Sequence, residues 1–123
     1  MDDLSFSDIL DMQHALWERN QNSWRPLEPK YARESFLWMM EELGEAIAII
    51  KKKGDTEIME NPAVRTHFTE EIADVLMYLG DVLMRYEITP QEIASAYEQK
   101  HTRDLSRNFV KEHAELFAEK PNP

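Results

Sequence analysis

Two short acidic stretches, residues 41–45 and 70–74, constrain the fold of this chain more than any other feature. In a helix of about 3.6 residues per turn, acids three positions apart share one face. The acids that share a face within these stretches are Glu42, Glu45, Glu71 and Asp74. No Lys or Arg follows any of them at three or four positions, where a solvated helix usually places a partner. Two such helices packed side by side would gather four carboxylates that need a cation from outside.

The type of ligand indicates which cation this would be. Carboxylate oxygens suit hard ions, Mg²⁺ first and Mn²⁺ as a possible substitute. His67, four residues before Glu71, is the only cation that the sequence places nearby. The alternative is an acidic surface stripe, which would be the better interpretation of one such stretch alone. Two stretches without local partners favour a magnesium site.

Length and composition limit the class of protein. The chain has 123 residues, 42% of them hydrophobic, which predicts a single domain over residues 1–123. Its net charge of −10 argues against binding a nucleic acid polymer, although an anionic small substrate stays possible. The absence of cysteine excludes disulfides and thiolate metal sites. Neither a signal peptide nor an apolar run of membrane-spanning length is found, so we expect a cytoplasmic protein with no membrane contact.

Helix signals divide the chain into four main helices. We expect helices over residues 4–21, 32–53 and 62–86, a fourth from Pro90, and a helical tail over 108–123. Gly54 is expected to end the second helix after Lys51, Lys52 and Lys53, three cations that suit a helix C-terminus. Asn61-Pro62 is expected to open the third helix, with 55–61 as a connector that can hold one helical turn. No segment has a strand pattern. The predicted fold is therefore all-α, an antiparallel bundle of four main helices with the metal site between the second and third.

The apolar residues of the second helix occupy two faces. The face predicted to lie in the core consists of Phe36, Met39, Met40, Leu43, Ile47 and Ile50. The nearly opposite stripe carries Trp38, Glu42, Glu45 and Ile49, and its apolar residues predict a cover by another helix, a second subunit or a ligand. We expect at least a homodimer with part of this stripe near the subunit contact. Trp38 precedes the carboxylates by one turn, so it is either a stacking platform for a base or an ordinary packing residue.

Two further stripes lie on the third and fourth helices. The core face of the third helix is expected to hold Phe68, Ile72, Val75, Leu76, Leu79, Val82, Leu83 and Tyr86. Beside it runs a polar stripe, which suits a site between helices and consists of His67, Glu71, Asp74, Tyr78, Asp81 and Arg85. The fourth helix carries Lys100, Asp104 and Arg107 on one face, with Arg103 adjacent. This basic stripe indicates either phosphate binding or a solvated face in which Asp104 pairs with Lys100.

These motifs resemble the MazG-like all-alpha nucleoside triphosphate pyrophosphohydrolases. The family's EExxE and ExxD motifs match Glu41-Glu42-x-x-Glu45 and Glu71-x-x-Asp74, and the family's tyrosine four residues later matches Tyr78. Its KxxxNxxR pattern matches Lys100, Asp104 and Arg107, with Asp in place of the usual Asn. The order and spacing of these motifs carry the resemblance, which spans residues 30 to 110.

The resemblance implies hydrolysis of a nucleoside triphosphate, often a deoxynucleotide, to the monophosphate and pyrophosphate in housecleaning or pool control. It also implies a homodimer or homotetramer. The expected magnesium ligands are Glu42, Glu45, Glu71 and Asp74. Glu41 would orient or deprotonate the attacking water. Lys100, Arg103 and Arg107 would hold phosphates, and Trp38, Tyr78 and Asp104 the base or sugar.

Three other interpretations compete with this one. A related enzyme of the same architecture could act on a different nucleotide, such as phosphoribosyl-ATP. A di-iron carboxylate bundle would need Glu-x-x-His pairs, whereas Ala48 and Asp74 stand three residues after Glu45 and Glu71. A non-catalytic helical interaction module with a vestigial metal site is the third, and the intact set of acids argues against it.

Overall fold

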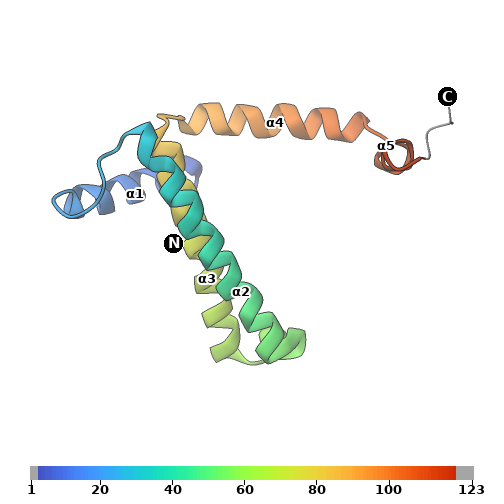
Figure 1. The fold of residues 1–123 in the computed structure, drawn as a ribbon, viewed down its shortest axis with the longest axis horizontal. Coiled ribbons are helices and arrows are strands. Elements are labelled where there is room, and N and C mark those ends of the chain that lie inside the picture. Colours follow the sequence, from blue (N-terminus) through green and yellow to red (C-terminus); the bar gives the residue numbers. More distant parts are fainter. Residues whose placement is uncertain (1–2, 119–123) are drawn as a thin grey trace. The chain divides into compact units, whose positions relative to one another are not determined.

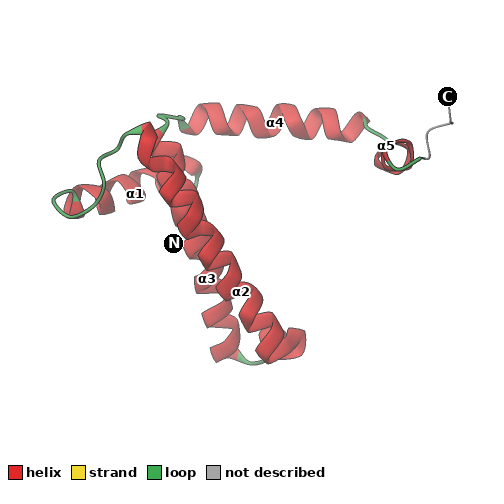
Figure 2. Ribbon diagram, viewed as in Figure 1, coloured by secondary structure: helices red, strands yellow, loops and turns green. Residues whose placement is uncertain are grey.

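The computed structural model describes residues 3–118, and every regular element in that range is a helix (Figure 2). The elements are α1 (Phe6–Asn20), the short 3₁₀ helix η1 (Pro29–Tyr31), α2 (Ala32–Glu60), α3 (Pro62–Arg85), α4 (Pro90–Ser106) and α5 (Phe109–Leu116) (Figure 1). The predicted all-α class is confirmed. The chain forms two compact units, residues 1–90 and 91–123, which are described separately. The expected helical tail extends in part over 119–123, outside the described residues.

The helix starts follow the capping residues of the sequence. Ser5 and Asp8 form a capping box on α1: the Asp8 amide donates to Ser5 Oγ at 3.1 Å, and the Ser5 amide donates to Asp8 Oδ2 at 2.9 Å. Asn61 Oδ1 accepts from the Ala63 amide at 3.1 Å and caps α3, with Pro62 at its first position. These local interactions explain why the expected start of the third helix is accurate to the residue.

As the sequence predicts, the first helical piece of α2 ends at Gly54. Its φ of +83° lies in the left-handed region, which glycine adopts without the steric cost of a Cβ. The chain returns to helical geometry for residues 55–60, so the expected connector is mostly helical. The result is a long straight piece over 32–53 and a short turn that leads into α3.

The helices α2 and α3 form a closely packed pair along their length (Figure 1). Residues of low exposure recur at alternating steps of three and four, the spacing of two helices that pack with a small crossing angle, although Gly80 and Leu83 of α3 are buried outside this series. On α2 they are Ala32, Ser35, Met39, Glu42, Ala46 and Ile49; on α3 they are Val64, Phe68, Glu71, Val75, Tyr78, Val82 and Arg85. We call these positions the seam. Its small residues let the two backbones approach, and its two glutamates stand where apolar residues are normal.

The predicted core face of α2 is wrong for the described unit. Met40 is 67% exposed and Ile47 is 51% exposed. Ile49, which the sequence analysis assigned to the opposite stripe, is buried. The sequence pattern shows that both faces carry apolar residues but not which face meets α3. The seam contains the smaller residues Ala32 and Ala46, which permit close packing.

The outward stripe of α2 has a counterpart on α3. Ile72, Leu76, Leu79 and Tyr86, predicted to lie in the core, are exposed, whereas Val82 and Leu83 are buried as expected. Each stripe lies one position after the seam on its helix, and because the helices are antiparallel both stripes fall on one side of the pair. We call this side the apolar face: Phe36, Met40, Leu43, Ile47, Ile50, Ile72, Leu76, Leu79, Leu83 and Tyr86.

The helix α1 packs against α3 and, with the following loop, encloses one end of the α2–α3 pair (Figure 1). Its buried residues are Leu10 and Gln13, and Gln13 Nε2 donates to Asp81 Oδ1 at 3.1 Å. The loop is held through the Arg25 carbonyl, which accepts from Trp17 Nε1 at 2.9 Å and from Arg85 Nη2 at 3.2 Å. These bonds fix the wall that the loop contributes to the site.

The second unit contains α4 and α5. Arg107 joins them by pairing with Asp104 at 3.0 Å and with Glu112 at 2.8 Å, and its guanidinium lies 4.4 Å from the centre of the Phe109 ring. Asn108 caps α5 by accepting from the Lys111 amide at 2.9 Å. Within residues 3–118, no helix combines the length and the apolar character that a membrane crossing requires.

Candidate metal centre

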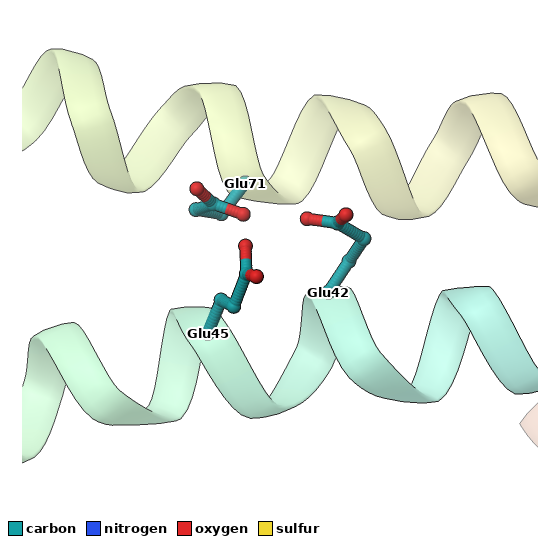
Figure 3. Close-up of side chains that lie close together, drawn as sticks. All are labelled: Glu42, Glu45 and Glu71. Atoms are coloured by element: carbon teal, nitrogen blue, oxygen red, sulfur yellow. The ribbon is translucent and has the colours of Figure 1, made fainter.

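Three carboxylates converge in the space between α2 and α3. Glu42 and Glu45 come from α2 and Glu71 from α3, and their side chains point toward one another (Figure 3). One oxygen from each lies within 4.8 Å of the others. Glu42 and Glu71 occupy seam positions, and Glu45 follows Glu42 by three residues on the same side of the helix. These three acids form the carboxylate cluster.

The cluster contains buried oxygens without partners. Oε2 of Glu42 and Oε2 of Glu71 are enclosed and accept no hydrogen bond from the part of the chain that is described. The Glu71 side chain is only 12% exposed, and the Nε2 atom of His67 lies 3.3 Å from its Oε1. A buried carboxylate oxygen without a donor is unfavourable. The residues therefore fit a bound cation, and the three carboxylates can hold a metal ion.

The electrostatics of the cluster agree with that geometry. The pKa of Glu42 is raised to about 7, first by its hydrogen bond with Glu71, then by burial and by the charges of Glu45 and Asp74. The pKa of Glu45 is also raised, mainly by its hydrogen bond with Glu71 and by the charge of that residue. The pKa of Glu71 is lowered because it accepts hydrogen bonds from Glu42 and Glu45. The raised pKa values of Glu42 and Glu45 are those expected of crowded carboxylates without a cation.

The fourth predicted ligand, Asp74, lies outside this group of three. It borders a large hollow of about 840 Å³, together with three other predicted site residues, Trp38, Glu41 and Tyr78. Its charge still reaches the cluster and contributes to the raised pKa of Glu42. Burial is the main cause of the raised pKa of Tyr78, followed by the charge of Glu42. The structure thus brings these predicted residues to one side of the α2–α3 pair.

We call this space the first hollow. Beyond the predicted residues it is lined by Gln13, Leu16, Ser23, Trp24, Arg25, Tyr31, Glu34, Ser35, Leu37, Met77, Asp81 and Arg85. Sequence reasoning did not assign Gln13, Asp81 and Arg85 to the site. Asp81 and Arg85 continue the polar stripe of α3, which was a visible signal, whereas the part of Gln13 depends on how α1 packs.

A second hollow of about 420 Å³ borders the other side of the cluster. It is lined by Glu45, Ala48, Ile49, Lys52, Lys53, Ala63, Val64, His67 and Glu71. Glu45 and Glu71 of the carboxylate cluster line this second hollow, whereas the first hollow is lined by the neighbouring acids Glu41 and Asp74. Sequence reasoning missed Lys52 and Lys53, which it had assigned only to the end of a helix.

The predicted phosphate-binding residues Lys100, Arg103 and Arg107 belong to the second unit, as does Asp104. Asp104 pairs with Arg107 rather than with Lys100, the pairing considered from the sequence. The positions of the two units relative to one another are not determined, so a role of these residues at the cluster stays a prediction.

In comparisons with protein families, with curated proteins and with solved structures, no family model, protein or structure matches this chain. The resemblance to the MazG-like enzymes therefore rests on the motif residues alone.

Proposed function

We propose that this chain is a Mg²⁺-dependent nucleoside triphosphate pyrophosphohydrolase that converts a ribo- or deoxynucleoside triphosphate and water to the monophosphate and pyrophosphate. The observation that carries this proposal is the pair of enclosed, unpartnered carboxylate oxygens on Glu42 and Glu71, next to Glu45. The motif order of the sequence, with Asp74 as a fourth ligand, supports the same assignment. Mn²⁺ would be an alternative to Mg²⁺.

The residues of the site suggest how the substrate lies. The first hollow offers Trp38 and Tyr78 as walls for the base and sugar, next to the carboxylates. When bound, the metal would offset phosphate charge and lower the pKa of water. Glu41 lines the same hollow and would accept a proton from the attacking water. The new bond joins the water oxygen to the alpha-phosphorus, and the bond from that phosphorus to the bridging oxygen breaks to release pyrophosphate.

The absence of a GxxxxGK[ST] motif from the sequence supports attack at the alpha-phosphorus rather than transfer of the gamma-phosphoryl group. In the proposal that follows from the sequence, Lys100, Arg103 and Arg107 hold the beta and gamma groups, and Asp104 contacts the base or sugar. This part requires α4, from the same or another copy, to reach the cluster.

We further propose that two copies of the chain form a homodimer through the apolar face. Its residues on α2 recur at 36, 40, 43, 47 and 50, and those on α3 at 72, 76, 79, 83 and 86. Both series have the alternating steps of four and three that helices use when they pack in bundles. Two hairpins joined by these faces would complete the expected antiparallel four-helix bundle, as a dimer of hairpins.

A second copy fits this face better than the chain's own α4. The apolar residues of α4 do not form a continuous stripe: Ile93, Ala94, Ala96 and Tyr97 lie in its first half and Leu105 near its end, with Lys100, Arg103 and Asp104 between them. A face that repeats its pattern along both α2 and α3 is matched by itself in a two-fold interface. Of the stripe expected near the subunit contact, Ile49 is buried within its own chain, whereas Trp38 is 53% exposed, so a contact near Trp38 stays a prediction.

Product analysis tests the reaction. We expect a panel of nucleoside triphosphates with Mg²⁺ to give monophosphate and pyrophosphate as first products on ion-exchange chromatography. In ¹⁸O-water the label should enter the monophosphate, because water attacks the alpha-phosphorus. Label in the pyrophosphate would mean attack at the beta-phosphorus, and orthophosphate as first product would mean a different enzyme. Cleavage of phosphoribosyl-ATP alone would identify the related enzyme. If no nucleotide is cleaved, the chain is the non-catalytic module.

A further inference from the structure

The second hollow is lined by basic residues to which the proposed function assigns no role. Two lysines, Lys52 and Lys53, border it together with His67, and Glu45 and Glu71 of the carboxylate cluster form its opposite limit. The chain has 24 acids and 14 lysines and arginines, so cations beside this cluster are not the product of a generally basic surface. One space thus presents cationic and metal-ligating groups together.

The helix geometry brings the lysines within reach of the cluster. Lys52 lies seven residues after Glu45, about 10 Å along the helix axis. Long side chains on a helix lean toward its N-terminus, which for Lys52 and Lys53 is the direction of Ala48, Ile49 and the cluster. The small side chains of Ala48 and Ala63 leave space along this path. The lysines can therefore reach a ligand held at Glu45 and Glu71.

The two lysines have no ion-pair partner in the described part of the chain. Neither Lys52 nor Lys53 forms an ion pair with any residue between 3 and 118. Lysines near the end of a helical piece also interact favourably with its last carbonyls. Lys51 satisfies that role equally well, yet it does not line the hollow. The position of Lys52 and Lys53 at the hollow therefore needs a further explanation.

A space with acids at one end and free lysines at the other suits a polyanion that arrives with its own metal ion. The metal meets the carboxylates, and the far phosphate oxygens meet the ammonium groups. We propose that the second hollow binds the pyrophosphate end of the substrate, with Lys52, Lys53 and His67 as its donors. This inference rests on the proposed function and gives the substrate a direction, with the nucleoside in the first hollow and the beta and gamma phosphates in the second.

The proposed orientation of the substrate has a consequence for α4. Every residue that the pyrophosphate site needs belongs to the first unit, so the site does not depend on where Lys100, Arg103 and Arg107 lie. Those residues would add contacts to a phosphate chain that Lys52 and Lys53 already hold.

Binding of pyrophosphate itself tests the proposal without relying on turnover. Isothermal titration with pyrophosphate and Mg²⁺ would compare the full chain with the double variant Lys52→Gln/Lys53→Gln and with the matched control Lys51→Gln. Because a hydrogen bond to a charged group is worth roughly a factor of ten in affinity, we expect the double variant to bind at least about tenfold more weakly. The control should bind like the parent, and the affinity for a nucleoside monophosphate should stay unchanged in both.

Each remaining outcome decides a separate point. Equal affinity of the parent and the double variant, an equal loss in Lys51→Gln, or no binding by the parent overturns the pyrophosphate site. If the parent and all variants hydrolyse nucleotides at the same rate, the hydrolase proposal stands and the pyrophosphate site is rejected. If the parent binds pyrophosphate through Lys52 and Lys53 but cleaves no nucleotide, the pyrophosphate site stands and the hydrolase proposal is rejected. Matching circular dichroism spectra and melting temperatures show that the exposed substitutions leave the fold intact.

Discussion

Arg85 Nη1 lies 3.3 Å from Asp81 Oδ1, one turn earlier on α3, and the two side chains are only 6% and 14% exposed. The same carboxylate oxygen accepts from Gln13 Nε2 of α1. Arg85 also donates to the Arg25 carbonyl of the loop that follows α1. This pair therefore connects three segments at the wall of the first hollow.

Replacing Arg85 with methionine should destabilise the fold strongly. Arg85→Met leaves Asp81 largely buried without its cation and the Arg25 carbonyl without one donor, and loss of one member of a buried pair costs about 3 kcal/mol. Urea unfolding followed by circular dichroism measures the change. Arg33→Met, at an exposed position of α2, is the control and should change the unfolding free energy by less than about 0.5 kcal/mol. Equal midpoints for the two variants would show that the pair contributes little.

The sequence predicts the helices and most of the acids of the site because both depend on local rules. Capping at Ser5 and Asn61, proline at Pro62 and the spacing of Glu42 to Glu45 are properties of a single helix. Which of the two apolar faces of α2 packs against α3 is not a property of a single helix. It depends on which side lets the backbones approach, and that requires knowing the partner helix.

The same reasoning explains what was missed at the site. Gln13 reaches the first hollow because α1 packs on α3, and no pattern within α1 marks it. Lys52 and Lys53 also fit a local role as cations at a helix end, so the sequence alone gives no reason to place them at a phosphate site. Their proposed role depends on the hollow that they line together with His67.

The stability of the metal-free protein should fall as pH rises toward 7. The pKa of Glu42 is raised from 4.5 to about 7, so between these values the folded state binds more protons than the unfolded state. The stability from this proton is full below pH 4.5 and is lost as pH rises through about 7. Thermal melts in EDTA across this range measure the slope. Glu42→Gln removes the group, and an unchanged slope in this variant would contradict the assignment.

Mg²⁺ should stabilise the folded chain, and more so at higher pH, because the ion competes with that proton and binds only the folded state. At a concentration of 100 Kd the gain is about 2.7 kcal/mol, which corresponds to roughly 10 °C in melting temperature. Glu45→Gln and Asp74→Asn should each remove most of the gain and most of the activity. Glu60→Gln, on the short turn after Gly54, should retain both. A full Mg²⁺ response in the first two variants would place the metal elsewhere.

Glu41→Gln should separate catalysis from metal binding. Glu41 lines the first hollow but is not one of the three clustered carboxylates. Loss of a general base lowers kcat by about 10²–10⁴-fold, while the Mg²⁺-dependent rise in melting temperature should persist. Steady-state kinetics and melts on the same preparation give both quantities. If the Mg²⁺ response disappears together with kcat, Glu41 is a metal ligand and not the base.

The apolar face gives the last prediction, because a single charge within it should dissociate the homodimer. Met40 lies in the middle of the α2 stripe and is 67% exposed in the isolated chain. Met40→Glu would bury a carboxylate among apolar side chains at the two-fold contact, which a dimer cannot accommodate without losing affinity. Met59 is the matched control: it is 68% exposed but lies beyond Gly54, outside the apolar face. Sedimentation equilibrium at micromolar concentration should show dimers for the parent and Met59→Glu, and a species near 14.5 kDa for Met40→Glu. A monomeric parent would mean that the apolar face is covered in another way. If Met40→Glu remains a dimer, the subunits meet at another surface.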